Sequence, residues 1–178
     1  MNNRKVLWIT QTGITMALLI VLQAATAPLN NTMITGSLVN LMLVVSVMIG
    51  GLTSGITVAL LSPIFAKLFG IGPLWTLIPF ISLGNIVLVL CWHLLGNKRY
   101  AALAIVRSVA ALAAAIAKSV TLYLGVVQVA IPMLLQLPAP QAAVISGMFS
   151  FPQFITALIG GGLAIVVIPL LKKAVKDM

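Results

Sequence analysis

The chain has 178 residues, ten Lys and Arg against one carboxylate residue, Asp177, and a formal net charge of +9. Its residues are 62% hydrophobic, and its mean hydropathy of +1.24 is typical of a protein that folds in a bilayer. Because no Asp or Glu precedes Asp177, the apolar part has no carboxylate to relay a proton, hold a sodium ion or act as a general base. The single Cys91 excludes an internal disulfide and a cysteine-based metal cluster. We expect no metal or cofactor.

Six apolar segments, separated by turn-forming residues, are predicted to be transmembrane helices. Residues 6–66 and 119–171 contain no charged side chain, and each is far longer than the ~20 residues that one spanning helix needs. Continuous apolar runs favour helices over the alternating strands of a barrel. The predicted spans are Val6–Ala27, Ile34–Ile49, Thr53–Phe69, Leu74–Leu95, Tyr100–Leu135 and Gln141–Leu171.

Glycine and proline mark the irregular points of these spans. Gly50 and Gly51 separate the second span from the third. Pro132 is expected to end the regular part of the long fifth span, and Pro152 to kink the sixth or give it a re-entrant start. Apolar sequence continues directly after the charged first residues, so we expect no cleaved signal peptide. With no hydrophilic domain, residues 1–178 are predicted to form one compact all-α membrane domain.

The basic residues orient this six-span bundle. The predicted loops around Asn30, Gly72 and Pro138 contain no Lys or Arg beyond Lys67, which lies near the end of the third span. Cytoplasmic loops are enriched in Lys and Arg, so both termini are predicted to be cytoplasmic. The positive charge therefore reflects topology and not a nucleic-acid surface. Seven basic residues fall on the cytoplasmic side: Arg4, Lys5, Lys98, Arg99, Lys172, Lys173 and Lys176.

Polar residues within the spans gather in the outer half of the membrane. At ~1.5 Å per residue, Lys118 lies ~26 Å above the cytoplasmic end of the fifth span. No intramembrane acid exists to pair with it, and an unpaired buried ammonium costs several kcal/mol, so water or an anionic ligand is expected to reach it. The predicted substrate-binding residues are Lys118, Asn40, Asn85, Lys67, Trp75, Ser37 and Gln153.

Structural alternatives exist for most of these residues. Trp75 suits the aromatic belt at the membrane interface, and Lys67 can extend its ammonium outward to water. Asn40 and Asn85 can bond a neighbouring helix. The lone His93, near the cytoplasmic end of the fourth span, is expected to be an interfacial or packed residue.

Gly13 and Ala17 form a small-residue pair, four positions apart, on the first span. Such faces let helix backbones approach closely in lipid, and internal packing is their common use. A mixed small and polar face suits a second protein, so this pair is predicted to be a partner-docking face. The polar residues of the same helix are Gln11, Thr12, Thr15 and Gln23.

In size, predicted span number and scarcity of soluble loops, the chain resembles the S components of energy-coupling factor (ECF) vitamin transporters. The resemblance covers essentially the whole chain, and its specific motifs are similar to those of one subgroup, the pantothenate type. These motifs are Thr35–Asn40, Gly50-Gly51, Leu60–Phe65, Gly70–Pro73 and Pro79–Asn85.

The resemblance implies a vitamin-binding subunit of the bacterial plasma membrane. Its partners would be a transmembrane coupling subunit and two cytoplasmic ATPases, and the subunit would topple in the membrane to release substrate inward. In this family an Ala-x-x-x-Ala pair on the first helix docks onto the coupling subunit, and Gly13 and Ala17 match it with Gly in the first position. The vitamin site would lie in the outer half, covered by the loops that follow the first and third spans.

A pantothenate substrate fits the polar inventory. Its carboxylate would meet Lys118, with Lys67 as a second cation, and its amide and hydroxyl groups would meet Asn40 and Asn85. Cobalamin is the main alternative, and the glycine and proline loops around Pro28 and Gly72 would have to open a wide mouth for it. A secondary transporter or passive facilitator, and a purely structural subunit, are further alternatives. An enzyme is not expected, because no nucleophile, base and orienting group can be assembled from these residues.

Overall fold

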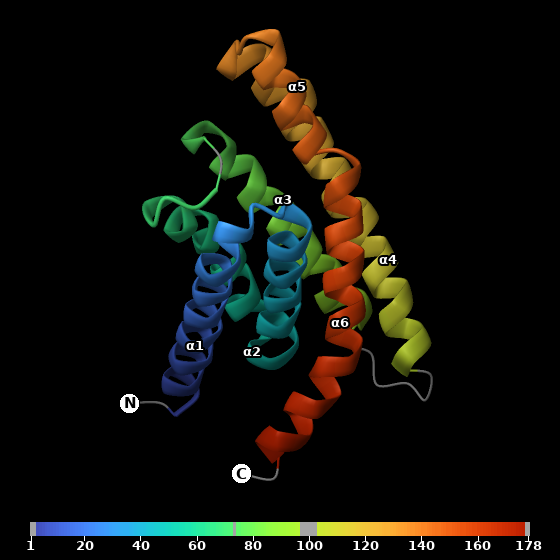
Figure 1. Ribbon diagram of the computed structural model, residues 1–178. Helices are drawn as coiled ribbons and strands as arrows, with labels where there is room; N and C mark the ends of the chain where they lie inside the picture. The colour runs from blue at the N-terminus through green and yellow to red at the C-terminus, as the bar shows by residue number, and fades with distance from the viewer. Residues whose placement is uncertain (1–2, 73, 97–102, 177–178) are drawn as a thin grey trace.

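The computed structural model describes residues 3–72, 74–96 and 103–176, and this part of the chain is helical with no strand. Figure 1 shows the helices packed as a bundle, with the start of α1 and the end of α6 at the same end. The α-helices are α1 (Asn3–Thr26), α2 (Thr32–Leu68), α3 (Ile78–Cys91), α4 (Leu103–Leu122), α5 (Ala139–Met148) and α6 (Phe151–Lys176). Two short 3₁₀ turns, η1 (Ala27–Leu29) and η2 (Trp75–Leu77), and two π-helical segments, η3 (Trp92–Gly96) and η4 (Tyr123–Leu135), adjoin them.

Five helical stretches are long and apolar enough to cross a membrane. The predicted all-α architecture is thereby confirmed for the described residues, and the length and composition of these helices are those of a multi-pass membrane protein. The five stretches are Lys5–Leu29, Thr32–Leu68, Trp75–Gly96, Ala104–Leu135 and Ala139–Lys173.

The second stretch, α2, reverses direction at Gly51. Its 37 residues would extend about 55 Å as one straight helix, against a hydrocarbon core of about 30 Å. Gly51 has φ 83° and ψ 179°, which a residue with a side chain adopts only with strain. A Cβ on Gly55 would lie 2.7 Å from the Val47 Cβ, so the two halves of α2 lie against each other beyond the turn. The predicted break at Gly50-Gly51 is confirmed, and Figure 1 shows α2 turning back at its lower end.

Local chemistry explains the turn between α1 and α2. Asn30 adopts a left-handed conformation (φ 48°) after η1, a geometry that Asn tolerates better than most residues. The Asn31 side chain accepts hydrogen bonds from the backbone N–H groups of Met33 (3.0 Å) and Ile34 (3.3 Å). It thereby satisfies donors that the first turn of α2 leaves free.

The predicted fifth and sixth spans differ in detail from the structure. Tyr100, the predicted start of the fifth span, lies outside the described residues, as do Lys98 and Arg99. In the predicted fifth span, the regular α-helix is α4, which ends at Leu122. The span continues as the π-helical η4, which contains Pro132, so the regular part ends before the proline. The predicted sixth span is divided into α5 and α6 immediately before Pro152, which takes a place in the first turn of α6 where proline is well tolerated.

The packed centre of the bundle lies between α2, α3, α4 and α6. Small residues on α4 and α6, among them Ala114 and Ala164, meet larger side chains such as Leu43 and Trp92 there. Helix α6 approaches α2 closely at Gly160, where a Cβ would lie 2.6 Å from both the Asn40 Cβ and the Ser37 carbonyl oxygen. Only glycine permits this approach, and it brings polar side chains of the two helices into contact.

Candidate functional site

Lys118 is buried among three helices and bonded to two side-chain amides. Its side chain, on the inner face of α4, is only 4% exposed. The Nζ donates to Asn40 Oδ1 on α2 at 2.6 Å and to Asn85 Oδ1 on α3 at 2.7 Å. Both amides are also buried, at 1% and 2% exposure. We call Lys118, Asn40 and Asn85, with Thr156 of α6, the lysine–amide cluster.

Thr156 connects a fourth element, α6, to this cluster. Asn40 Nδ2 donates to Thr156 Oγ1 at 3.4 Å, and the threonine hydroxyl donates to the Gln153 carbonyl oxygen at 3.1 Å. The contact depends on the close approach at Gly160, one turn farther along α6. Four helices therefore hold the lysine in place through neutral groups.

When Lys118 is protonated, no acid of the bundle balances its charge. An ammonium has three N–H donors, and the two amide oxygens take two of them. The amides solvate the charge but do not neutralise it, and the chain's one carboxylate residue, Asp177, lies beyond the described residues. A buried, unneutralised cation is costly unless a ligand or water completes its environment.

A cavity of about 200 Å³ opens beside the lysine–amide cluster, and we call it the lysine cavity. Lys118, Asn40 and Asn85 line one part of it, and residues of α1 and of the start of α6 line others. Two of its lining side chains carry buried oxygens without a hydrogen-bond partner in the described structure: Gln23 Oε1 and Ser62 Oγ. Buried polar atoms are rarely left unpaired, so these two oxygens are lining atoms that still require a hydrogen-bond donor.

The structure brings together four of the seven predicted binding residues. Lys118, Asn40, Asn85 and Gln153 line the lysine cavity, and their role in binding stays a prediction. Gln153 is half-buried, and its Nε2 donates to the Met148 carbonyl oxygen at 3.1 Å, where α5 ends.

The other three predicted residues lie outside the cavity lining. Ser37 is buried, but its hydroxyl donates to the Met33 carbonyl oxygen of its own helix at 2.7 Å. Lys67 lies half-buried in the last turn of α2. Trp75 begins η2 and is 54% exposed, as expected for an interfacial aromatic residue.

Three residues of the site were absent from the predicted binding set: Gln23, Ser62 and Thr156. Gln23 had been grouped with the partner-docking face, and Ser62 with a family motif. Counting along the chain estimates the depth of a residue, but the direction in which each helix faces decides which side chains reach a cavity. In a further contact beside the cavity, Thr35 Oγ1 donates to Thr26 Oγ1 at 2.9 Å, which joins the start of α2 to the end of α1.

The small and polar residues of α1 lie on different sides of the helix. Gly13 and Ala17 are exposed, and a Cβ on Gly13 would have no neighbour within 4 Å. Thr12 instead faces inward, where its hydroxyl bonds the Ser54 hydroxyl at 3.0 Å. The prediction of one mixed small and polar face was wrong for Thr12 and Gln23, because both lie on the packed side. The small pair remains on an open surface.

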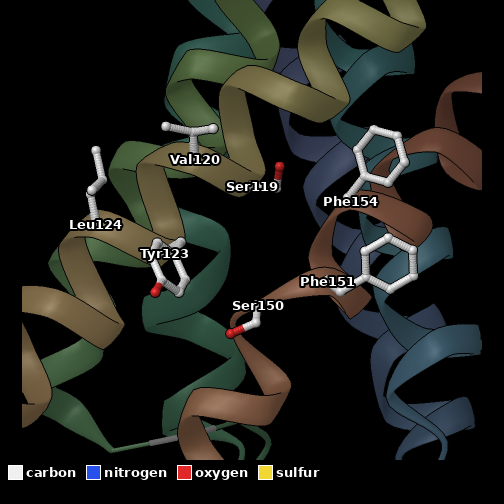
Figure 2. A pocket seen from close by; sticks show the side chains of 7 residues that line it. All are labelled: Ser119, Val120, Tyr123, Leu124, Ser150, Phe151 and Phe154. Atoms are coloured by element: carbon white, nitrogen blue, oxygen red, sulfur yellow. The ribbon is translucent and has the colours of Figure 1, made fainter.

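A larger groove, of about 410 Å³, lies between α4 with η4 and the start of α6. Figure 2 shows Val120, Tyr123 and Leu124 on one wall, with Phe151 and Phe154 on the other. Its two serines have bonded hydroxyls: Ser119 donates to Ile116 O at 2.9 Å and Ser150 to Ser146 O at 2.5 Å. The remaining polar group of the lining is the Tyr123 hydroxyl, which accepts a hydrogen bond from Gln128 Nε2 at 2.9 Å, so the groove is mainly apolar and holds no charged side chain.

Comparisons with protein-family models, with curated proteins and with solved structures give no match for this chain. The functional argument therefore depends on the chemistry of the lysine cavity and on the sequence motifs. The lysine cavity is the polar one of the two sites just described. It combines a buried cation, two amides and two unpaired oxygens, which together suit a small ligand with a negative charge and several hydrogen-bonding groups.

Proposed function

We propose that this chain is the substrate-binding membrane subunit, or S component, of an ECF-type vitamin importer, and that its substrate is a small anionic vitamin. The observation that carries the proposal is the buried Lys118, which neutral amides hold at the edge of a cavity. A carboxylate on the substrate would supply the missing negative charge. A purely structural role does not account for a cation without a counter-ion in the centre of a bundle.

Pantothenate is the proposed substrate. Its carboxylate would accept the free N–H of Lys118, while its amide and two hydroxyls would bond Gln23, Ser62 and Gln153 around the cavity. The cavity volume of about 200 Å³ supports a substrate of this size. Drug-sized ligands occupy pockets of roughly 300–1,000 Å³, so a molecule as bulky as cobalamin would require a much wider opening.

The proposed topology has six crossing segments, with α2 crossing twice on either side of Gly51. Both termini would be cytoplasmic. Figure 1 supports this arrangement, because the start of α1 and the end of α6 lie at the same end of the bundle. A basic residue near each of these two termini, Lys5 and Lys173, supports it as well. The lysine cavity would then face the outside of a bacterial cell.

The proposed partners are a transmembrane coupling subunit and two cytoplasmic ATPases. Gly13 and Ala17 would receive the coupling subunit, since they leave a flat, exposed strip on α1. Exposed Ile14 and Leu18 beside the pair would add apolar contact area. The chain would topple on this module to deliver its substrate.

Mass spectrometry of small molecules released from the purified full-length chain tests the substrate. We expect pantothenate, and release of cobalamin or another vitamin would replace that part of the proposal while keeping the class of protein. Uptake measured in cells with and without the ATPases tests the class. Uptake that persists without them would instead establish a self-standing transporter or facilitator, and absence of any ligand binding would favour a structural subunit.

A further inference from the structure

A second cation, Arg107, is buried at the other end of α4, away from the lysine cavity. It lies about three turns before Lys118 on the same inner face of the helix. Its side chain is only 8% exposed, and its Nε has no hydrogen-bond partner in the described structure. Nothing in the proposed transport mechanism uses it. A buried guanidinium N–H needs a hydrogen-bond acceptor, and the described residues do not supply one.

Lys172 is on α6, the helix that packs against α4, and lies within electrostatic range of Arg107. Helices α4 and α6 pack against each other, with a Cβ on Gly161 only 2.9 Å from the Ala111 Cβ, and the buried Ile168 of α6 is one turn before Lys172. The positive charge of Arg107 acts on the Lys172 ammonium by Coulombic repulsion. Two like charges within range of each other are unfavourable, and an anion that both can reach turns this repulsion into two attractions.

The surroundings of the two cations identify the kind of anion. Arg107 is in the second turn of α4 and Lys172 in the last two turns of α6, so both lie near the membrane surface at the end where α1 begins. Ile105 and Leu170, on the outer sides of the two helices, are 68% and 64% exposed. A ligand here therefore meets cations and hydrocarbon-facing side chains together, which matches a lipid with a charged headgroup and acyl chains.

We propose that Arg107 and Lys172 bind the phosphate of an anionic lipid headgroup between the start of α4 and the end of α6. The planar guanidinium matches two phosphate oxygens, and the lysine adds a mobile point charge. Basic pockets between transmembrane helices are known to take headgroups of this kind. The site is independent of the proposed transport function, and it anchors α4, the helix that carries Lys118.

Native mass spectrometry of the full-length chain tests the site. Detergent-solubilised protein is mixed with phosphatidylglycerol or with phosphatidylcholine of the same acyl chains, and the bound lipid is counted. We expect the wild type to retain phosphatidylglycerol preferentially. R107Q and K172Q should each weaken its retention about tenfold or more, because a charge-assisted hydrogen bond is lost. K173Q, a matched loss of charge at the exposed neighbouring lysine, should change retention less than twofold.

Further outcomes separate this site from general attraction to a basic surface. Equal retention of the two lipids, or an equal loss in K173Q and K172Q, would overturn the proposal. If R107Q does not fold, R107K provides a variant that keeps the charge. The lipid retention of K172Q, a substitution at an exposed residue, then decides the outcome. Inorganic phosphate that displaces the lipid at low concentration would assign the site to a free anion. Stronger lipid retention in D177N would show that the chain's own carboxylate is the occupant.

Discussion

At the scale of single residues, the lysine–amide cluster combines a buried charge with groups that solvate but do not neutralise it. Asn40 and Asn85 use their oxygens on Lys118, and the distances of 2.6 and 2.7 Å are those of charge-assisted hydrogen bonds. A carboxylate in the place of either amide would satisfy the lysine permanently. The neutral amides instead leave the charge able to attract a ligand.

Replacing Lys118 should weaken ligand binding strongly. A hydrogen bond to a charged group contributes about 1.5–3 kcal/mol, so Lys118→Ala should lower the affinity for pantothenate roughly ten- to a hundredfold in calorimetry. Lys67→Ala is the matched control, because Lys67 lies outside the cavity lining, and it should bind like the wild type. Unchanged affinity in Lys118→Ala would refute the anion site, and an equal loss in both variants would point to a general effect of charge.

Ser62 allows a test in which affinity and stability respond differently. Its hydroxyl is buried beside the cavity without a partner in the described residues, so Ser62→Ala removes an unsatisfied polar group. The ligand-free protein should be as stable as the wild type or more stable, as measured by its thermal unfolding midpoint. Affinity for the ligand should fall roughly two- to tenfold, since a neutral hydrogen bond contributes about 0.5–1.5 kcal/mol. A variant that loses stability and keeps its affinity would remove Ser62 from the site.

At the scale of helices, glycine decides how the elements meet. Gly51 reverses α2, and Gly160 brings α6 so close to α2 that Asn40 reaches Thr156. Gly13 differs from both, because its surface is open and no part of the described chain packs on it. A small residue on an exposed face of a membrane helix has no internal packing role, which is why α1 is the helix proposed to meet a partner.

Large residues on the exposed strip of α1 should uncouple transport from binding. Gly13→Leu with Ala17→Leu would hold the coupling subunit away from α1 and reduce vitamin uptake by cells severalfold or more. Ligand affinity of the isolated chain should stay within twofold, because neither residue lines the lysine cavity. Val166→Leu, an enlarging substitution at an exposed residue of α6, serves as a surface control away from α1. Normal uptake by the double variant would exclude this strip as the docking face.

At the scale of the whole molecule, the sequence predicts the all-helical fold and names three residues that the structure brings into contact, Lys118, Asn40 and Asn85. Apolar runs predict the helices, and depth counting places Lys118 and Asn40 in the outer half of the membrane with Asn85 somewhat deeper, and the structure joins the three side chains. The depth of a residue does not give its rotation about the helix axis. For this reason the predicted binding set omits Gln23 and Ser62, which line the cavity, and includes Trp75, which does not. The buried Arg107 was also not foreseen, because its burial depends on how α4 packs against α6.

The six-span topology itself makes a prediction about which loops face outward. The turn at Asn30, the loop at Gly72 and the segment before α5 at Pro138 lie at the opposite end of the bundle from the start of α1 (Figure 1). Single cysteines at these positions, in a Cys91→Ser background, should react with an impermeant thiol reagent on intact cells. A cysteine at Gly51, where α2 turns at the other end, should react only after lysis. Because Gly51 has a positive φ, a cysteine at the neighbouring Leu52 provides an unstrained second probe of that end. The opposite pattern would invert the orientation and place the lysine cavity towards the cytoplasm, which is incompatible with the capture of an external vitamin.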